Sequence, residues 1–417
     1  MTGLHILLSV TLEFRPIGRE ELRQFATVNS TAFGEALDSW HEGWFDSHFE
    51  GSATMAAFDA GGLVGSSMMM PITVSVPGGA VPAAGVTAVG VLPTHRRRGI
   101  MRGMMTRLLE EARSRQLPLA VLWASEGGIY SRFGFGPAAR SVGIELQHPK
   151  AALLPHPSTG RLRLVSLEEA RQIFPPVHAR VVSQRPAMVA RDAVGWRYAL
   201  SEEDPHLPPG EAHLFAVVHE TDSGPDGYLV YRIKSEWTPR GPENTLVVVE
   251  MVAADPTATA ELWRYCTEVD LVRRIQATGR GARPVDDPIW WLLADPQAVV
   301  GTLMTTLWAR VVDVPGLLRM RRYRQDGAVT LELGGSPDQE RARFRLEVEG
   351  GVGRCRPTDE PADVRLEWAG LGSLCLGMPC LSQLVTAGRA TTASEAITRR
   401  LDAIMGWEPA PWCFEDI

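Results

Sequence analysis

One segment of the sequence combines a strand pattern, a basic loop that ends in glycine, and a helix pattern. Residues 86–91 are apolar and favour a strand, while residues 100–114 repeat apolar side chains every three or four positions, as an amphipathic helix does. The loop between them runs from Pro93 to Gly99 and contains Arg96, Arg97 and Arg98. A helix amino terminus offers unpaired N–H groups, glycine allows close approach, and arginines add charge-assisted bonds. The segment therefore predicts an α/β fold with a site for a pyrophosphate-like anion.

Two familiar phosphate motifs are excluded at this loop. No Gly-Lys-Ser/Thr follows, so it is not a Walker loop, and the G-x-G-x-x-G fingerprint of dinucleotide-binding domains is missing. The alternative interpretation is a solvated basic turn that caps a helix. The strand before the loop and the helix after it make this alternative less favoured than an anion site. His95 is expected to be a loop residue and not a ligand or base.

Length and charge narrow the class of protein. At about 100–200 residues per domain, 417 residues predict two to four domains. The formal charge of −7 argues against a nucleic-acid binder that depends on global charge and is compatible with a cationic substrate. The five cysteines are odd in number and contain no C-x-x-C pair, so we expect neither a disulfide framework nor a zinc site, and a reducing compartment.

The amino-terminal apolar stretch, residues 4–10, is short and lacks a basic flank, so we interpret it as a first strand and not as a signal peptide. No apolar run reaches the roughly 18 residues of a membrane span. We therefore expect a cytoplasmic protein without a membrane span, with secretion left open.

A partial repeat indicates how the domains are organised. Residues 246–252 form a strand pattern, residues 253–257 a loop with the same Pro-Thr pair, and residues 258–271 a helix pattern, but the arginines and the glycine of the first copy are missing. We interpret this as a duplicated fold whose second copy has lost its phosphate loop; a chance match of two short elements is the alternative. The expected domains are residues 1–150, 151–304 and 305–417.

The third segment has an α+β pattern. Its expected strands are Trp308–Val314, Val329–Leu333, Ala342–Val348 and Val364–Trp368, and its expected helices are Leu371–Leu376 and Ser394–Met405. The last residues, 406–417, contain two prolines and so cannot form a helix throughout, yet they carry three aromatic side chains. We expect this tail to dock on the rest of the protein.

An aromatic and glycine-rich stretch, residues 125–136, follows the strand expected at residues 119–124. Its Tyr130 is a candidate general acid, because a phenol can protonate a departing thiolate. A glycine-rich turn with packed aromatic rings is the alternative, and we prefer it for Phe133 and Phe135.

The loop resembles the R/Q-x-x-G-x-G/A hallmark of the GCN5-related N-acetyltransferase (GNAT) superfamily, because Arg96-x-x-Gly99-x-Met101 fits except at the last position. Together with the stretch from Ser125 to Gly134, it closely resembles the enhanced intracellular survival (Eis) family of aminoglycoside N-acetyltransferases. That resemblance implies two tandem GNAT-like domains, the second degenerate, and a C-terminal α+β domain like sterol carrier protein. It also implies a hexamer, acetyl-CoA as acetyl donor, and no metal.

The resemblance further implies roles for individual residues. Val89, Gly90 and Val91 would lie along the pantetheine arm, and the pyrophosphate would be surrounded by Arg97, Arg98, Gly99, Ile100, Met101 and Arg102, with Ser125 and Glu126 beside the cofactor. In the family the terminal carboxylate is the general base, which here is that of Ile417, with Trp412 and Phe414 as anchors. Candidates for binding the substrate amine are Asp416 and Glu35 for its charge and Phe33 and Trp44 as pocket walls.

The expected reaction is direct attack by a primary amine in a ternary complex, with Tyr130 as acid and no covalent enzyme intermediate. Aminoglycosides, acetylated at several positions, are the first candidate substrates. Other polyamine-like primary amines are the second. One alternative is an acyltransferase for protein lysines or a small metabolite amine. Another is a lipid- or partner-binding protein with vestigial activity, against which the intact arginine loop weighs.

Overall fold

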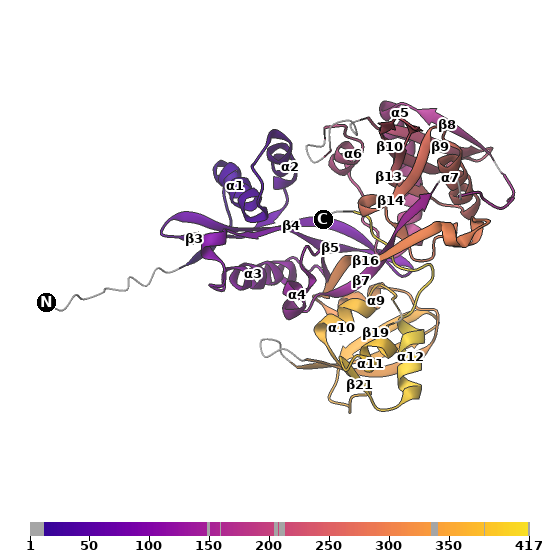
Figure 1. The fold of residues 1–417 in the computed structure, drawn as a ribbon. Coiled ribbons are helices and arrows are strands. Elements are labelled where there is room, and N and C mark those ends of the chain that lie inside the picture. Colours follow the sequence, from indigo (N-terminus) through magenta and orange to yellow (C-terminus); the bar gives the residue numbers. More distant parts are fainter. Residues whose placement is uncertain are drawn as a thin grey trace.

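The computed structural model describes residues 12–147, 151–158, 160–203, 207, 213–334, 341–378 and 380–415. The strand expected at residues 4–10 lies outside them. A 14-stranded sheet runs through the first three quarters of the chain, and a separate five-stranded sheet forms the C-terminal part. In Figure 1 the first half of the large sheet carries α1 and α2 on one face and α3 and α4 on the other.

The first half of the large sheet follows the expected alternation of strands and helices. Its elements are β1 (Glu13–Arg15), η1 (Arg19–Glu21), α1 (Leu22–Phe33), α2 (Ser39–Phe49), β2 (Ala53–Thr54), β3 (Ala56–Asp59), β4 (Gly62–Val76), β5 (Gly79–Val91), η2 (Pro93–His95), α3 (Ile100–Ser114), β6 (Leu119–Leu122), α4 (Gly127–Tyr130), η3 (Ser131–Phe133) and β7 (Gly136–Gln147). The helix expected at residues 100–114 is confirmed over its whole length.

The second half repeats the arrangement, with α5 and α7 on opposite faces of its strands. Its elements are β8 (Arg161–Val165), α5 (Leu167–Gln184), α6 (Ala193–Ala199), β9 (Phe215–Thr221), β10 (Gly224–Lys234), β11 (Trp237–Thr238), β12 (Gly241–Pro242), β13 (Asn244–Ala253), α7 (Pro256–Glu268), β14 (Val272–Ala277), η5 (Gly279–Gly281), β15 (Arg283–Pro284), α8 (Ile289–Leu292), η6 (Pro296–Ala298) and β16 (Val299–Val311). The loop expected at residues 253–257 is wrong at its end: Asp255 caps α7 by accepting from Thr257 N, and Pro256 takes the first helical position.

Among its described residues, the C-terminal part packs four helices on its own sheet, which has the order β19-β18-β17-β20-β21. Its elements are α9 (Val314–Met320), β17 (Gly327–Gly334), β18 (Ala342–Glu349), β19 (Val352–Pro357), β20 (Val364–Glu367), α10 (Trp368–Leu374), α11 (Leu381–Thr386), β21 (Ala390–Thr392) and α12 (Glu395–Met405). The expected α+β pattern is confirmed, but its first strand is not: Trp308 to Val311 end β16, and Val314 begins α9.

β16 joins the two halves of the large sheet. Its last residues, 308–311, pair with β6, while residues 299–309 pair with β7, whose other edge pairs with β14. Each half is therefore completed by strands that also belong to the other. The border expected between residues 304 and 305 falls inside this strand, and the three domain ranges stay a prediction.

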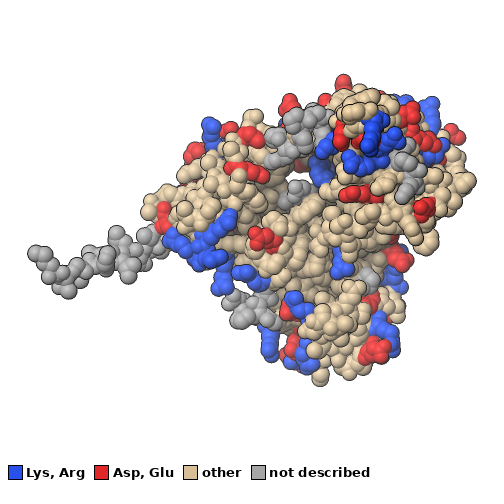
Figure 2. Space-filling view, viewed as in Figure 1, with Lys and Arg blue, Asp and Glu red and all other residues tan. Residues whose placement is uncertain are grey.

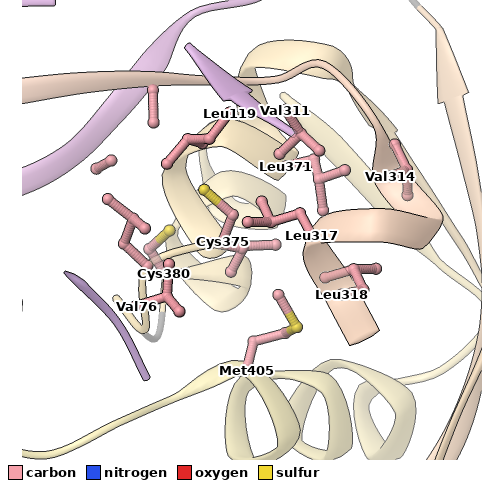
Figure 3. Packing of buried hydrophobic residues seen from close by; sticks show 14 of the residues in the cluster. Val76, Leu119, Val311, Val314, Leu317, Leu318, Leu371, Cys375, Cys380 and Met405 are labelled. Carbon is pink, nitrogen blue, oxygen red and sulfur yellow. The ribbon is translucent and has the colours of Figure 1, made fainter. Parts of the chain in front are cut away.

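One core connects the C-terminal part to the first half of the large sheet. Figure 3 shows Val76 and Leu119 of the first half and Val311 of β16 meeting Leu317 and Met405 of the C-terminal part. All of these side chains are buried. Burial of apolar surface is worth about 25 cal/mol per Å², so this shared core fixes the C-terminal part on the sheet.

The cysteines and the helices add two further findings. All five cysteines are free and buried. In the part of the chain that the structure describes, no helix has the length and apolar character that crossing a bilayer requires.

Candidate active site

β5 leaves the strand next to it halfway along its length. The parallel ladder between β5 and β6 spans Ala83–Gly85 and Leu119–Val121 and stops there. On its other side β5 continues to pair with β4 up to Val91. Within the described residues, the edge of β5 that faces β6 therefore has no strand partner over residues 86–91. Val89, Gly90 and Val91 lie along this open part of β5, which an extended polar ligand could join, although the Val91 carbonyl also accepts from Arg96 Nε at 3.4 Å.

A β-bulge shapes this open part of β5. Ala88 has φ 52°, and the pairing with β4 shifts register between Ser66 and Met68. Ser66 Oγ donates to the carbonyl of Ala88 at 3.0 Å and accepts from Asn29 Nδ2 at 3.3 Å. A Cβ on Gly90 would lie 2.8 Å from that of Ala32, so α1 approaches the strand closely at this glycine. The bulge redirects the strand, as bulges beside active sites commonly do.

The basic loop after β5 is held by two of its three arginines. Arg96 donates to the carbonyl of Ala32 at 2.9 Å, which ties the loop to α1. Arg98 is ion-paired with Asp59 at 2.7 Å. Arg97 has φ 62° and an exposed side chain that forms no hydrogen bond or ion pair with the described residues. Of the three guanidinium groups, that of Arg97 is therefore the one most available to an anion.

Gly99 directly precedes α3 and has φ 79°, in the left-handed region that favours glycine. Ile100 is buried, Met101 is partly buried, and both side chains are apolar, so the N–H groups of these two residues are what they can donate to an anion. Arg102 is exposed. Figure 2 shows basic side chains gathered at the end of the molecule where β3 and the start of α3 lie. The helix dipole and this charge together favour an anion here.

Tyr130 ends α4 and is buried against Phe135. Burial, and secondly the nearby charge of Glu126, raise the pKa of the Tyr130 phenol to about 12. The phenol therefore stays protonated across the neutral range, as a proton donor must. A Cβ on Gly127 would lie 2.5 Å from the Trp308 ring, so α4 rests directly on β16. Ser125 and Glu126 are exposed just before α4.

The residues expected around the substrate amine lie at the end of α1 and in α2. Phe33 is 53% exposed, and Glu35 Oε2 lies 3.9 Å from Nε2 of His41. Trp44 is half-buried and packs on Phe45 and His48, in a different core from Tyr130. The described contacts do not bring these three residues against Tyr130, and their roles stay predictions.

Asp416 and Ile417, which carry the expected ammonium-binding and base roles, lie outside the described residues. The tail before them docks as expected: Trp412 and Phe414 are buried in the core of the second half. Sequence reasoning missed the group that receives the tail, where Glu415 meets Arg191 at 2.7 Å. No local signal pointed to it, because its members are far apart in the sequence.

Comparison with known families identifies each part of the chain. The acetyltransferase (GNAT) domain matches residues 13–138, a second acetyltransferase (GNAT) domain matches residues 187–311, and the sterol carrier protein domain matches residues 314–414. The duplication indicated by the partial repeat is thereby confirmed. The first copy contains the open edge of β5 and the Gly99 loop.

Relatives are similar along the whole chain. An uncharacterized N-acetyltransferase of Streptomyces griseus is 34% identical over 97% of this chain and 99% of its own length. The N-acetyltransferase Eis of Mycobacterium tuberculosis is 34% identical over 85% of this chain and 86% of its own. The crystal structure of Eis1 from Mycobacterium abscessus superposes with a TM-score of 0.85 at 30% identity, covering 97% of this chain and 100% of that one. With two GNAT domains, a sterol carrier protein domain and these relatives, the chain belongs to the Eis family of N-acetyltransferases.

Proposed function

We propose that this N-acetyltransferase transfers the acetyl group of acetyl-CoA to primary amines of aminoglycosides, at more than one position. The observation that carries the proposal is the open edge of β5 over residues 86–91, which leads straight to the left-handed Gly99 and the start of α3. The choice of aminoglycosides rests on the family resemblance of residues 93–99 and 125–134, and the net charge of −7 is compatible with cationic substrates.

The residues present suit acetyl-CoA. The open edge of β5 along Val89, Gly90 and Val91 would pair with the amides of pantetheine, and the N–H groups after Gly99 would bind the pyrophosphate, with Arg97 adding charge. Arg98, held by Asp59, would act mainly by shaping the loop. When bound, the thioester supplies the activated acetyl group.

Two groups of this chain would then move protons. An ammonium must lose a proton before it can attack, and the α-carboxylate of Ile417 is the base that the family resemblance implies. Tyr130, whose phenol keeps its proton at neutral pH, would donate to the departing sulfur. The attack forms the amide bond and breaks the C–S bond, so no covalent bond to the enzyme is needed.

The proposal is tested by thiol release from acetyl-CoA with the purified chain. We expect turnover with kanamycin or neomycin, more than one acetyl group per drug molecule by mass spectrometry, and weaker turnover with spermidine and a lysine peptide. Turnover with the lysine peptide but with no aminoglycoside would mean that the substrates are protein lysines and not aminoglycosides. Folded protein that releases no thiol with any of these amines would rule out the proposal.

Substitution of Gly99 tests the loop. An alanine at φ 79° is strained by about 1 kcal/mol and places a methyl group where the pyrophosphate would approach. We expect Gly99→Ala to raise the KM for acetyl-CoA about tenfold, equal to about 1.4 kcal/mol, with a smaller change in kcat.

Gly388 provides the matched control, because it also has positive φ (70°), and a Cβ there meets no atom within 4 Å. Gly388→Ala introduces similar backbone strain far from β5, in the C-terminal part. We expect the same small loss of stability and an unchanged KM. Equal KM values in the two variants would mean that Gly99 does not contact the cofactor.

A further inference from the structure

Arg191 lies where the two halves of the large sheet meet. The residues before it attach to β4 of the first half: Val189 bridges Val74, and Met188 accepts from Ser75 N at 2.9 Å. The Arg191 side chain is only 3% exposed. Val74 and Ser75 pair with Val81 and Ala80 of β5, the strand whose later residues 86–91 form the open edge, so Arg191 is anchored to the sheet that carries the candidate active site.

Arg191 binds two buried carboxylates. It donates to both oxygens of Glu250, at 2.9 and 2.7 Å, and Tyr228 donates its hydroxyl to the same carboxylate. Its second partner is Glu415, 2.7 Å away, from the end of the described chain. His178 Nε2 lies 3.5 Å from the same Glu415 oxygen. A residue of the tail thus completes an ion-pair network inside the second half.

The tail residues before Glu415 are also held by contacts with the rest of the protein. The indole of Trp412 donates to the carbonyl of Ala282 at 3.1 Å, and Ser141 of β7 donates to that of Cys413 at 3.4 Å. The Arg191 guanidinium also lies 5.3 Å from the ring of Phe414. Backbone and side chains are therefore fixed at successive positions up to Glu415.

Apolar packing alone could hold the tail on the protein without a buried charge at its end. Burial alone would raise the pKa of Glu415, but the charge of Arg191, with His178 3.5 Å away, outweighs it and lowers the pKa to about 2. An apolar residue of similar size often stabilises a core as well as a buried ion pair does, whereas an ion pair fixes one register. An ion-pair network at this place is therefore suited to fixing the position of the tail.

We propose that Arg191 and Glu415 are positioning residues for acetyl transfer: they seat the C-terminal segment at the junction of the two GNAT domains, so that the residues after Glu415 are presented to the acetyl-transfer site. The second domain, which lacks the arginine loop, would thus serve as the seat of the tail. The inference rests on the proposed function, in which the Ile417 carboxylate is the base.

Glu415→Gln tests the seat with little change of shape, because Arg191 keeps Glu250. We expect carboxypeptidase Y to remove the last residues about tenfold faster than from the unmodified chain, followed by intact mass. We also expect kcat for amine acetylation to fall about tenfold or more while the KM for acetyl-CoA is unchanged. Glu415→Asp, which keeps the charge, should recover part of both effects.

Glu408→Gln is the matched control, since it makes the same substitution in the same tail at an exposed pair with Arg324. It should change neither trimming nor kcat. Trimming of Glu415→Gln at the unmodified rate would overturn the proposal, and faster trimming with unchanged kcat would overturn the positioning role. If the unmodified chain acetylates no amine, the proposed function is wrong. The trimming assay still tests the second proposal on its own, because an unchanged trimming rate of Glu415→Gln would show that Glu415 does not hold the tail.

Discussion

Tyr130→Phe is expected to lower kcat for amine acetylation by about 10²–10³-fold, the range in which general acids commonly contribute. The ring stays in its buried place against Phe135, so the KM for acetyl-CoA and the thermal midpoint should hardly change. Because the pKa of the phenol is raised to about 12, ionisation of Tyr130 should cause no loss of kcat in the unmodified protein up to about pH 10. Steady-state kinetics from pH 6 to 10 measures both effects.

Tyr265→Phe is the control for this substitution. It removes a half-buried hydroxyl that contacts the hydroxyl of Tyr231 at 2.9 Å, in the second GNAT domain. Its kcat should stay within about twofold of the unmodified value, since nothing in the mechanism depends on it. A Tyr130→Phe variant that performed equally well would show that another group, or water, protonates the leaving sulfur.

The candidate cofactor site could be predicted from sequence because its signals are local. An apolar strand, a glycine and a helical repeat lie within thirty residues, and each has a physical meaning without the rest of the fold. The predicted helix therefore agrees with α3 at both ends. The left-handed Ala88 could not be predicted, since its bulge depends on Ser66 and Asn29 across the sheet and not on its neighbours in the chain.

The arrangement between the domains escaped prediction for the same reason. The sequence pattern places Trp308 in the third segment, but it pairs in the large sheet and supports the α4 helix that ends in Tyr130. The aromatic side chains of the tail correctly indicated docking, whereas the buried carboxylate beside them gave no signal. Glu415 and Arg191 belong to different thirds of the chain, and only folding brings them together.

Arg191→Met is expected to have the largest effect on stability, a loss of about 3–5 kcal/mol, because two buried carboxylates, Glu250 and Glu415, lose their shared cation. Methionine retains most of the apolar contact of the arginine side chain, so the loss of stability measures the removal of its charge. Denaturant unfolding followed by fluorescence measures it. Arg399→Met, at an exposed helical pair with Glu395, should cost less than about 1 kcal/mol.

The pH dependence of this loss identifies its cause. A carboxyl whose folded pKa is lowered, as that of Glu415 is to about 2, adds stability that is complete above its usual 4.5 and lost as the pH falls through about 2. Without Arg191, burial instead raises the pKa of Glu415, so the variant gains stability when that carboxyl takes up a proton. As the pH falls from 7 to about 4.5, the gain of the variant shrinks the difference between the two proteins, and below about 4.5 the loss in the unmodified protein shrinks it further. A difference that stayed constant over this range would mean that lost packing, and not the orphaned carboxylates, destabilises the variant.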